Sequence, residues 1–189
     1  MTSFYSIEEL KYLGLKSYGH NVLISRFCNI YGADQITIGN NVRIDDFCIL
    51  SGKIEIGSNI HISAYVALYG ANGIKIEDYS GISPRSTIYS AMDDFSGDYL
   101  VGPIHSKATI NVKGGMVLVK KYVQIGCNCV IFPNITIEEG AVIGAMSLVK
   151  ENVKSWGIYA GIPVVRCKAS KTQTPKKMIE SDNTVDTLD

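Results

Sequence analysis

An aliphatic side chain returns every six residues through most of this chain. A few steps of two residues and one long polar segment interrupt this period without ending it. Six is neither the helical period of about 3.6 residues nor the period of two of a simple strand. The ladder positions, all isoleucine, leucine or valine, are Ile24, Ile30, Ile36, Ile38, Ile44, Leu50, Ile56, Ile62, Leu68, Ile74, Ile76, Ile82, Ile88, Val119, Ile125, Ile131, Ile137, Ile143 and Val149.

The residue two places before a ladder position is mostly small or apolar as well, as at Val42, Cys48, Ile54, Ile60, Val66, Val123, Cys129, Ile135, Ala141 and Ser147. Residues two apart share one face of an extended strand, so each hexad predicts one short strand with two inward side chains. The remaining pair predicts a corner, because its residue types tolerate tight or left-handed backbone. These pairs are Asn40-Asn41, Ser58-Asn59, Pro84-Arg85, Cys127-Asn128, Pro133-Asn134 and Glu139-Gly140.

Coils of this kind, stacked about 4.8 Å apart, bury a continuous aliphatic column. The pattern therefore predicts an all-β fold, a solenoid of triangular cross-section. A β-sandwich is the competing interpretation, but its turns recur every 8–12 residues, and so regular a ladder argues against it.

The pattern also divides the chain into segments. Ser6 and Glu9 stand at capping-box spacing and predict a short helix over residues 6–13. Coils are expected over residues 22–88 and 117–154, and the polar residues 89–116 between them are expected to form an inserted loop. The polar residues 155–189 are expected to form a C-terminal tail. At 189 residues, the chain 1–189 fits a single domain.

Composition narrows the classes of partner. Lys plus Arg (18) balance Asp plus Glu (18), so no basic field indicates nucleic acid or anionic lipid. The N-terminus lacks the pattern of a signal peptide, and no apolar run is long enough to span a bilayer. The five cysteines fall in no disulfide or zinc-ribbon spacing. We expect a cytoplasmic protein with reduced thiols, no metal and no membrane partner.

The ladder resembles that of the hexapeptide-repeat ("isoleucine patch") acyltransferases over residues 17–168. The ending VIGAMSLVKENVKSWGIYAGIPVVRCK, with its Gly161-Ile162-Pro163 turn before a basic strand, is similar to the family's last coil and tail. The resemblance implies a left-handed parallel β-helix in one acyltransferase domain. It also implies homotrimers with active sites between subunits, acetyl-CoA as acyl donor, and a sugar or nucleotide sugar as acceptor. Such an activity would serve surface polysaccharide biosynthesis, either of lipopolysaccharide O-antigen or of capsule.

Within this family, the sequence aligns with the galactoside and maltose O-acetyltransferase branch. That alignment implies coenzyme contacts at Cys127, Ala145, Lys150, Gly161, Pro163 and Lys168, with Arg166 nearby. The chemistry of these residues agrees, because a cofactor with a 3′-phosphate and a pyrophosphate needs cations. A small residue such as Ala145 leaves room for the pantetheine arm.

The loop histidine that serves as general base in that branch is replaced here by Asp93. Three interpretations stay open. Asp93 or Asp94 acts as the base, with its pKa raised by burial or by its neighbour. Alternatively, His105 in the same loop supplies an imidazole. In the third interpretation the acceptor is an amine, which needs no strong base, and the acidic loop orients an amino sugar. By position the loop 89–116 completes the site.

Other candidate residues lie near predicted corners. Ser63 stands where the branch has a sugar-contacting asparagine, and Tyr65 and Tyr89 are placed to stack on a sugar face. His61 is expected to point outward between two inward isoleucines. Cys129 is expected inward and Cys127 at a corner, so the pair is not expected to bind metal.

Two other functions remain to be tested. A zinc hydratase of the same fold needs three converging histidines, and the chain has only His20, His61 and His105, at a spacing that does not match. A non-catalytic β-helix used for binding or assembly is the other alternative. The outward row turns apolar in the second tract, as at Val130, Val142 and Leu148, which predicts an oligomer.

Overall fold

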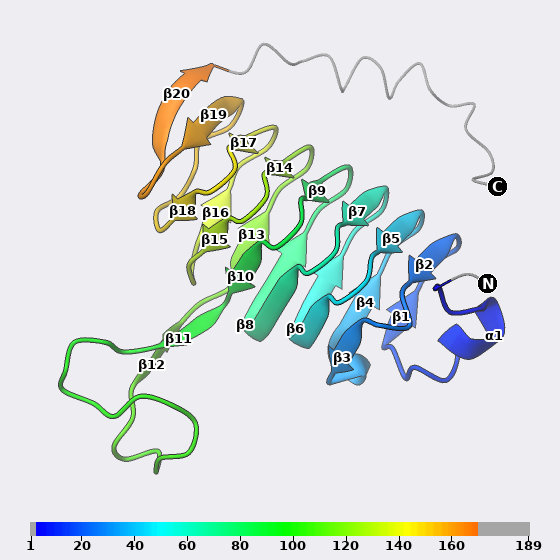
Figure 1. The fold of residues 1–189 in the computed structure, drawn as a ribbon, viewed down its shortest axis with the longest axis horizontal. Helices are drawn as coiled ribbons and strands as arrows, with labels where there is room; N and C mark the ends of the chain where they lie inside the picture. Colours follow the sequence, from blue (N-terminus) through cyan, green and yellow to red (C-terminus); the bar gives the residue numbers. More distant parts are fainter. Residues whose placement is uncertain (1–2, 170–189) are drawn as a thin grey trace.

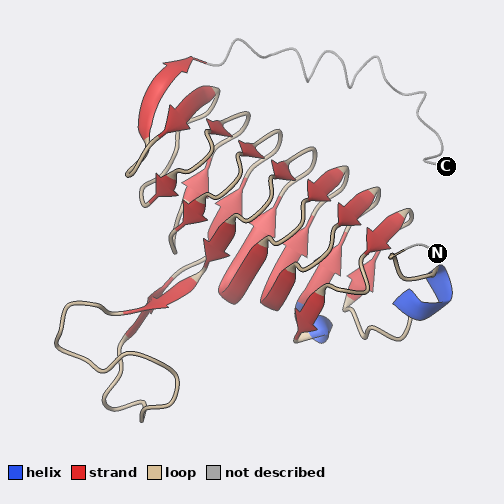
Figure 2. Cartoon of the chain, viewed as in Figure 1, coloured by secondary structure: helices blue, strands red, loops and turns tan. Residues whose placement is uncertain are grey.

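The computed structural model describes residues 3–169 and consists almost entirely of short parallel strands wound into a solenoid (Figure 1, Figure 2). One face is a single sheet with the strand order β2-β5-β7-β9-β14-β17-β19-β20. Its strands are β2 (Val22–Ile24), β5 (Val42–Ile44), β7 (Ile60–Ile62), β9 (Gly81–Ile82), β14 (Gln124–Ile125), β17 (Val142–Ile143), β19 (Gly157–Ala160) and β20 (Val165–Ala169). All neighbours in this sheet are parallel except β19 and β20.

The other two faces belong to one bent sheet. Its long strands turn a corner, so that Ile49–Ser51 pairs with one short strand and Ile54–Ile56 with another. The strands are β1 (Ser17–Tyr18), β3 (Asn29–Tyr31), β4 (Ile36–Ile38), β6 (Ile49–Ile56), β8 (Ala67–Ile76), β10 (Thr87–Tyr89), β13 (Val117–Val119), β15 (Val130–Ile131), β16 (Thr136–Ile137) and β18 (Leu148–Val149). The three faces give the triangular cross-section that the hexads predict.

The ladder forms the core. Every ladder position is buried except Ile30, which lies in the first turn and packs against the core while partly exposed. The residues two places earlier are buried too, including Cys48, Cys129 and Ser147. Burying one such aliphatic side chain contributes about 1.5–3 kcal/mol, so the repeated column is the main source of stability.

Residues in the left-handed region of φ form the three edges of the prism. The predicted corners are confirmed: φ is positive at Asn41, Asn59, Arg85, Asn128, Asn134 and Gly140. We call the edge that includes Asn21, Asn41, Asn59, Tyr79, Tyr122, Gly140 and Trp156 the Asn41 edge. Side-chain amides are stacked along it, because Asn21 donates to Asn41 (3.1 Å) and Asn41 donates to Asn59 (3.0 Å).

Every insertion into the hexad pattern lies on one edge, which we call the loop edge. The two-residue steps of the ladder fall at residues 31–35, where Gly32 and the 3-10 helix η1 (Ala33–Gln35) occur, and at residues 69–73. The long segment between Ile88 and Val117 leaves from the same edge. Part of it forms an antiparallel hairpin of β11 (Ala91–Asp93) and β12 (Val112–Gly114), and Figure 1 shows it projecting from the solenoid.

The ends differ in extent from the predicted segments. The helix α1 spans only Ile7–Leu10, with the Ser6 and Glu9 capping box present. It stops before residue 13 because the amides of Tyr12 and Leu13 bond to carbonyls three residues back and Gly14 takes a positive φ. At the other end, β19 continues the sheet beyond residue 154, and β20 pairs with it. The rest of the expected tail, residues 170–189, lies outside the described residues.

Among residues 3–169, no helix has the length and apolar character needed to cross a bilayer.

Candidate functional site

The third edge of the prism, which we call the Pro84 edge, brings together several of the residues singled out in the sequence. Its corner residues bond from coil to coil: Tyr65 N to Asp46 O, Arg85 N to Ala64 O, Asn128 N to Pro84 O, and Met146 N to Cys127 O, all at 2.8–3.1 Å. Cys127 and Ala145 therefore stand one above the other, with Pro84 and Ala64 on the preceding coils. Ser63 and Tyr65 belong to the same edge.

Close packing of the last coils places the expected coenzyme residues. A Cβ on Gly126 would lie 2.6 Å from the Ala145 amide nitrogen, so only glycine allows these coils to approach this closely. Gly161 continues the edge, since its carbonyl accepts from Leu148 N (2.9 Å) and its amide donates to Ser147 Oγ (3.1 Å). Ala145 is exposed, and its methyl group leaves the adjacent surface open.

The expected cations lie at the same end of the solenoid. Lys150 follows β18, whereas Arg166 and Lys168 lie on β20, opposite Tyr159 and Ile158. All three are exposed, and among residues 3–169 none of them makes an ion pair. Pro163 lies in the turn between β19 and β20. These cations are therefore available to a polyanionic ligand.

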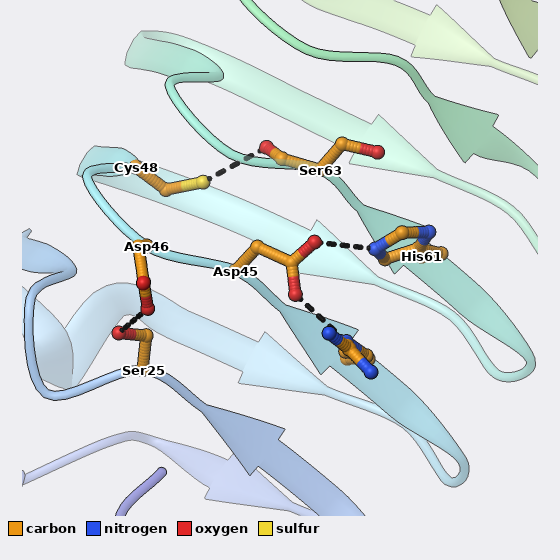
Figure 3. Close-up of polar contacts among 7 residues, drawn as sticks. Ser25, Asp45, Asp46, Cys48, His61 and Ser63 are labelled. Carbon is orange, nitrogen blue, oxygen red and sulfur yellow. Dashed lines mark hydrogen bonds and ion pairs between the residues drawn. The ribbon is translucent and has the colours of Figure 1, made fainter. Parts of the chain in front are cut away.

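A charged cluster that the sequence analysis did not anticipate lies beside the N-terminal half of the Pro84 edge (Figure 3). Asp45 accepts from Arg43 Nε and pairs with His61 Nε2, each at 2.7 Å. His61 does point outward, as expected. Partial burial raises the pKa of Asp45, but the hydrogen bonds from Arg43 and His61 outweigh burial, and the pKa is lowered overall. Asp45 therefore holds both side chains against the face of β5 and β7.

Two more contacts in Figure 3 link neighbouring coils along this edge. Ser25 Oγ donates to Asp46, and the buried Cys48 thiol donates to the Ser63 carbonyl at 3.1 Å. Asp45 and Asp46 had no motif to mark them in the sequence. Their position in the corner register, one coil away from Ser63, is the signal that would have found them.

The inserted loop separates the roles of its two adjacent carboxylates. Consecutive residues of an extended strand point to opposite sides, and Asp94, which follows β11, is only 7% exposed. Asp94 pairs with Lys113 (3.0 Å) and accepts from Asn111 Nδ2 (2.8 Å) and Ser96 N (3.0 Å). The Lys113 ammonium and these hydrogen bonds lower its pKa to about 2. A general base at this position would need a raised pKa, so the lowered pKa of Asp94 argues against that role.

The other loop candidates lie apart from that contact. Asp93 is half-buried at the end of β11, and its backbone pairs with Val112. His105 is half-buried in the loop beyond the hairpin. Tyr89 lies at the loop-edge end of β10 and stacks on Tyr69 at 5.2 Å, so within one protomer it is across a face from Tyr65.

The cysteines and histidines do not form a metal site in the described chain. Within residues 3–169, no three His, Cys, Asp or Glu side chains are grouped to hold a metal ion. Cys129 is buried and Cys127 is half-exposed at the corner, as their register predicts.

Comparison with known proteins identifies the family of this chain. No family model matches the sequence. The chain is 40% identical, over 93% of its length and 91% of the relative's, to the dTDP-4-amino-4,6-dideoxy-D-glucose acyltransferase of Escherichia coli. The chain belongs to the hexapeptide-repeat acyltransferase family.

Solved structures agree with this assignment. AntD, an N-acyltransferase from Bacillus cereus, is 53% identical, with a TM-score of 0.93 over 96% of this chain and 97% of AntD. AntD variants with a substituted serine or aspartate have been crystallised, and two serine variants are in complex with dTDP-4-amino-4,6-dideoxyglucose and coenzyme A. AntD has also been crystallised with dTDP and 3-hydroxybutyryl-CoA. A hexapeptide-repeat acetyltransferase from Vibrio cholerae in complex with acetyl-CoA, 19% identical with a TM-score of 0.62 over 88% of this chain and 80% of its own, shares the fold.

Proposed function

We propose that this protein transfers an acyl group from coenzyme A to the amino group of a dTDP-linked 4-amino-4,6-dideoxy sugar. The observation that carries the proposal is the likeness to AntD over nearly the whole of both chains, because AntD has been crystallised with both kinds of substrate. The relative from Escherichia coli acts on the same class of acceptor. An amine acceptor is also the interpretation that accounts for Asp93 at the position where the O-acetyltransferase branch has a histidine.

The Pro84 edge supplies the donor site in this proposal. Cys127, Ala145, Gly161 and Pro163 would line the pantetheine arm, and Lys150, Arg166 and Lys168 would meet the phosphates of acetyl-CoA or of a longer acyl-CoA. The exposed position of Ala145 and the three cations at that end, which make no ion pair within residues 3–169, support this assignment. The chemistry requires no metal.

The reaction is an attack of the neutral amine on the thioester carbonyl carbon. A C–N bond forms, the C–S bond breaks, and the proton lost from nitrogen ends on the CoA sulfur, which gives an amide and a free thiol. A neutral amine carries its own lone pair, so the step needs positioning more than deprotonation. Asp94 fits this scheme as a positioning residue, because it is bound to Lys113, Asn111 and Ser96 and its pKa is about 2.

Assembly is the second part of the proposal. The outward row of the face between the Pro84 edge and the loop edge is in register from coil to coil and largely apolar: Ile49, Ala67, Thr87, Val130 and Leu148. We infer that a homotrimer covers this face, with the loop 89–116 of one subunit completing the site of its neighbour. We place the enzyme in the cytoplasm, in the synthesis of a surface polysaccharide precursor.

A two-substrate assay tests the activity. Purified protein with acetyl-CoA or 3-hydroxybutyryl-CoA and dTDP-4-amino-4,6-dideoxyglucose should yield the N-acylated nucleotide sugar, detected by mass spectrometry, with one CoA released per product. The matched control is dTDP-glucose, which keeps the nucleotide but lacks the amine. Turnover of neither acyl-CoA, or equal turnover with dTDP-glucose, would contradict the proposal. A monomer in sedimentation at micromolar concentration would contradict the intersubunit site.

A further inference from the structure

The imidazole of His61 is held in one orientation by a carboxylate. His61 Nε2 lies 2.7 Å from Asp45 Oδ2, and the other oxygen of Asp45 accepts from Arg43 Nε. The pKa of Asp45 is lowered overall, so this side chain is ionised near neutral pH and accepts a hydrogen from Nε2. The neutral ring therefore carries its hydrogen on Nε2 and its lone pair on Nδ1. An imidazole oriented in this way by a third group is typical of a general base.

The lone-pair side of the ring is open to a ligand. Within residues 3–169, His61 makes no hydrogen bond besides that to Asp45, and its side chain is 53% exposed. Figure 3 shows the second ring nitrogen on the side away from Asp45. From β5 the ring faces Arg43 and Asp45, whereas its register partner on β9 is Gly81, against which the neutral amide of Gln124 lies. No charge of the described coils therefore faces the ring from its C-terminal side.

A row of outward residues runs alongside the Pro84 edge and connects His61 with the expected donor residues. Each of their amides donates to a carbonyl of the next coil at 2.7–3.0 Å, which places them one above the other. We call them the Ser83 row: Asp45, Ser63, Ser83, Gly126 and Gly144. The row has no side chains beside Cys127 and Ala145, and it carries hydroxyl groups and a carboxylate toward the N-terminal coils. His61 precedes Ser63 by two residues and therefore points outward on the same coil.

These positions bring the acceptor's amino group close to His61. In the proposed donor site the pantetheine arm follows Cys127 and Ala145, so the thioester would lie at the N-terminal end of that track, near Ser83. An attacking nitrogen must come within about 3–3.5 Å of the carbonyl carbon. Coils are about 4.8 Å apart, so an amine beside the coil of Ser83 is one coil spacing from His61. A side chain of this length spans that distance.

The acceptor's amino group must lose two protons in the proposed reaction. Amino groups have pKa values of about 8–10, so near neutral pH the acceptor is mostly an ammonium ion without a lone pair. One proton must leave before the attack, and the second ends on the CoA sulfur. Asp94 is a poor acceptor for the first proton, because its pKa is about 2.

We propose that His61, positioned by Asp45, removes the first proton from the ammonium group of the acceptor. An N–H bond of the ammonium breaks and a bond from that hydrogen to His61 Nδ1 forms, which gives a neutral amine and an imidazolium. The exposed imidazolium then returns the proton to water. This inference rests on the proposed function and names the residue that prepares the acceptor for attack.

The dependence of kcat/KM on pH tests the inference, with acetyl-CoA and dTDP-4-amino-4,6-dideoxyglucose as substrates. Without its base the enzyme would use only the amine that is already neutral in solution. His61→Gln should therefore lower kcat/KM about 10- to 1,000-fold at pH 7. This deficit should shrink about tenfold per pH unit until the amine itself titrates. Asp45→Asn, which leaves the ring without its orienting carboxylate, should show a smaller deficit with the same pH trend.

The controls separate a base from a binding contact. Titration calorimetry of His61→Gln with CoA and with dTDP should show less than a twofold change in either affinity. His20→Gln is the matched control, because His20 is an exposed histidine that adjoins Asn21 on the Asn41 edge. It should retain the kcat/KM of wild-type protein at every pH.

The possible results distinguish this inference from the proposed function. If wild-type protein turns over the substrates and His61→Gln behaves like His20→Gln, the inference is refuted and the function stands. A deficit that is constant from pH 7 to pH 9, or a matching loss of dTDP affinity, also refutes it, because His61 is then a contact and not a base. If wild-type protein gives no product with either acyl-CoA, the proposed function fails first. His61→Asn takes the place of His61→Gln if that variant does not fold.

Discussion

Gly140 offers a quantitative test of how the Asn41 edge supports the last coil. Gly140 has φ +67°, and a Cβ there would lie 2.3 Å from Trp156 Cε3 and 2.4 Å from Cζ3, on the face of the indole ring. Gly140→Ala must therefore bear the left-handed backbone cost of about 1–2 kcal/mol and displace Trp156 from Tyr122, its stacking partner at 6.4 Å. Losing that pair costs about 0.5–1.5 kcal/mol.

The expected destabilisation is thus about 1.5–3.5 kcal/mol, or a fall in Tm of about 3–14 °C for a chain of this size. Thermal unfolding at one fixed protein concentration measures it, since an oligomer's Tm depends on concentration. Gly14→Ala is the backbone control, because Gly14 has φ +71° and its Cβ would meet nothing within 4 Å. Trp156→Ala/Gly140→Ala completes a double-mutant cycle and should recover the steric part. Equal costs for Gly14→Ala and Gly140→Ala, with no coupling to Trp156, would refute the reasoning.

Three other predictions concern the loop, the thiols and acid stability. Asp94→Asn should speed protease cleavage within residues 95–110 severalfold and leave the shape of the pH–rate profile near neutrality unchanged, whereas loss of a limb of that profile would show that Asp94 titrates as a base. A thiol reagent should label Cys127 and Cys167 quickly, and CoA should protect Cys127. Burial raises the pKa of Cys28 to about 12 and of Cys48 to about 11, so fast labelling of either would contradict the structure. The pKa values of Glu9 and Asp94 are lowered to about 2, so their contribution to stability is complete above pH 4.5 and lost as pH falls toward 2. Arg26→Gln, which removes the partner of Glu9, should flatten that loss in acid-unfolding curves, and an unchanged curve would count against the pair.

Periodicity predicted the solenoid well, because the period is imposed by burial. Ile62 and Ile125 are inward for the same local reason, and each corner needs a residue that tolerates positive φ, such as Asn41 or Gly140. The length of α1 was predicted less well, because its end depends on bonds three residues back and on Gly14.

The candidate site was predicted only in part. The sequence singled out Cys127, Ala145 and Ser63 as candidates, but only the structure places them on one edge, and Asp45 had no motif to mark it. Asp45 contacts His61 sixteen residues away, because the intervening coil returns the chain to the same face. The adjacent pair Asp93 and Asp94 looked equivalent in sequence, yet Lys113 and Asn111 bind only Asp94.

The sequence by itself determined the coil, its corners and its aliphatic core, because those depend on the local alternation of inward and outward side chains. Only the tertiary structure decided which residues of different coils share an edge, and therefore that Phe27, Phe47, Tyr65 and Arg85 form one stack in line with Cys127 and Ala145. It also decided that the two-residue steps and the long loop leave from one edge. The physical reason is that coil-to-coil register is set by backbone hydrogen bonds between residues about twenty apart, or about forty apart across the loop, and short insertions shift that register.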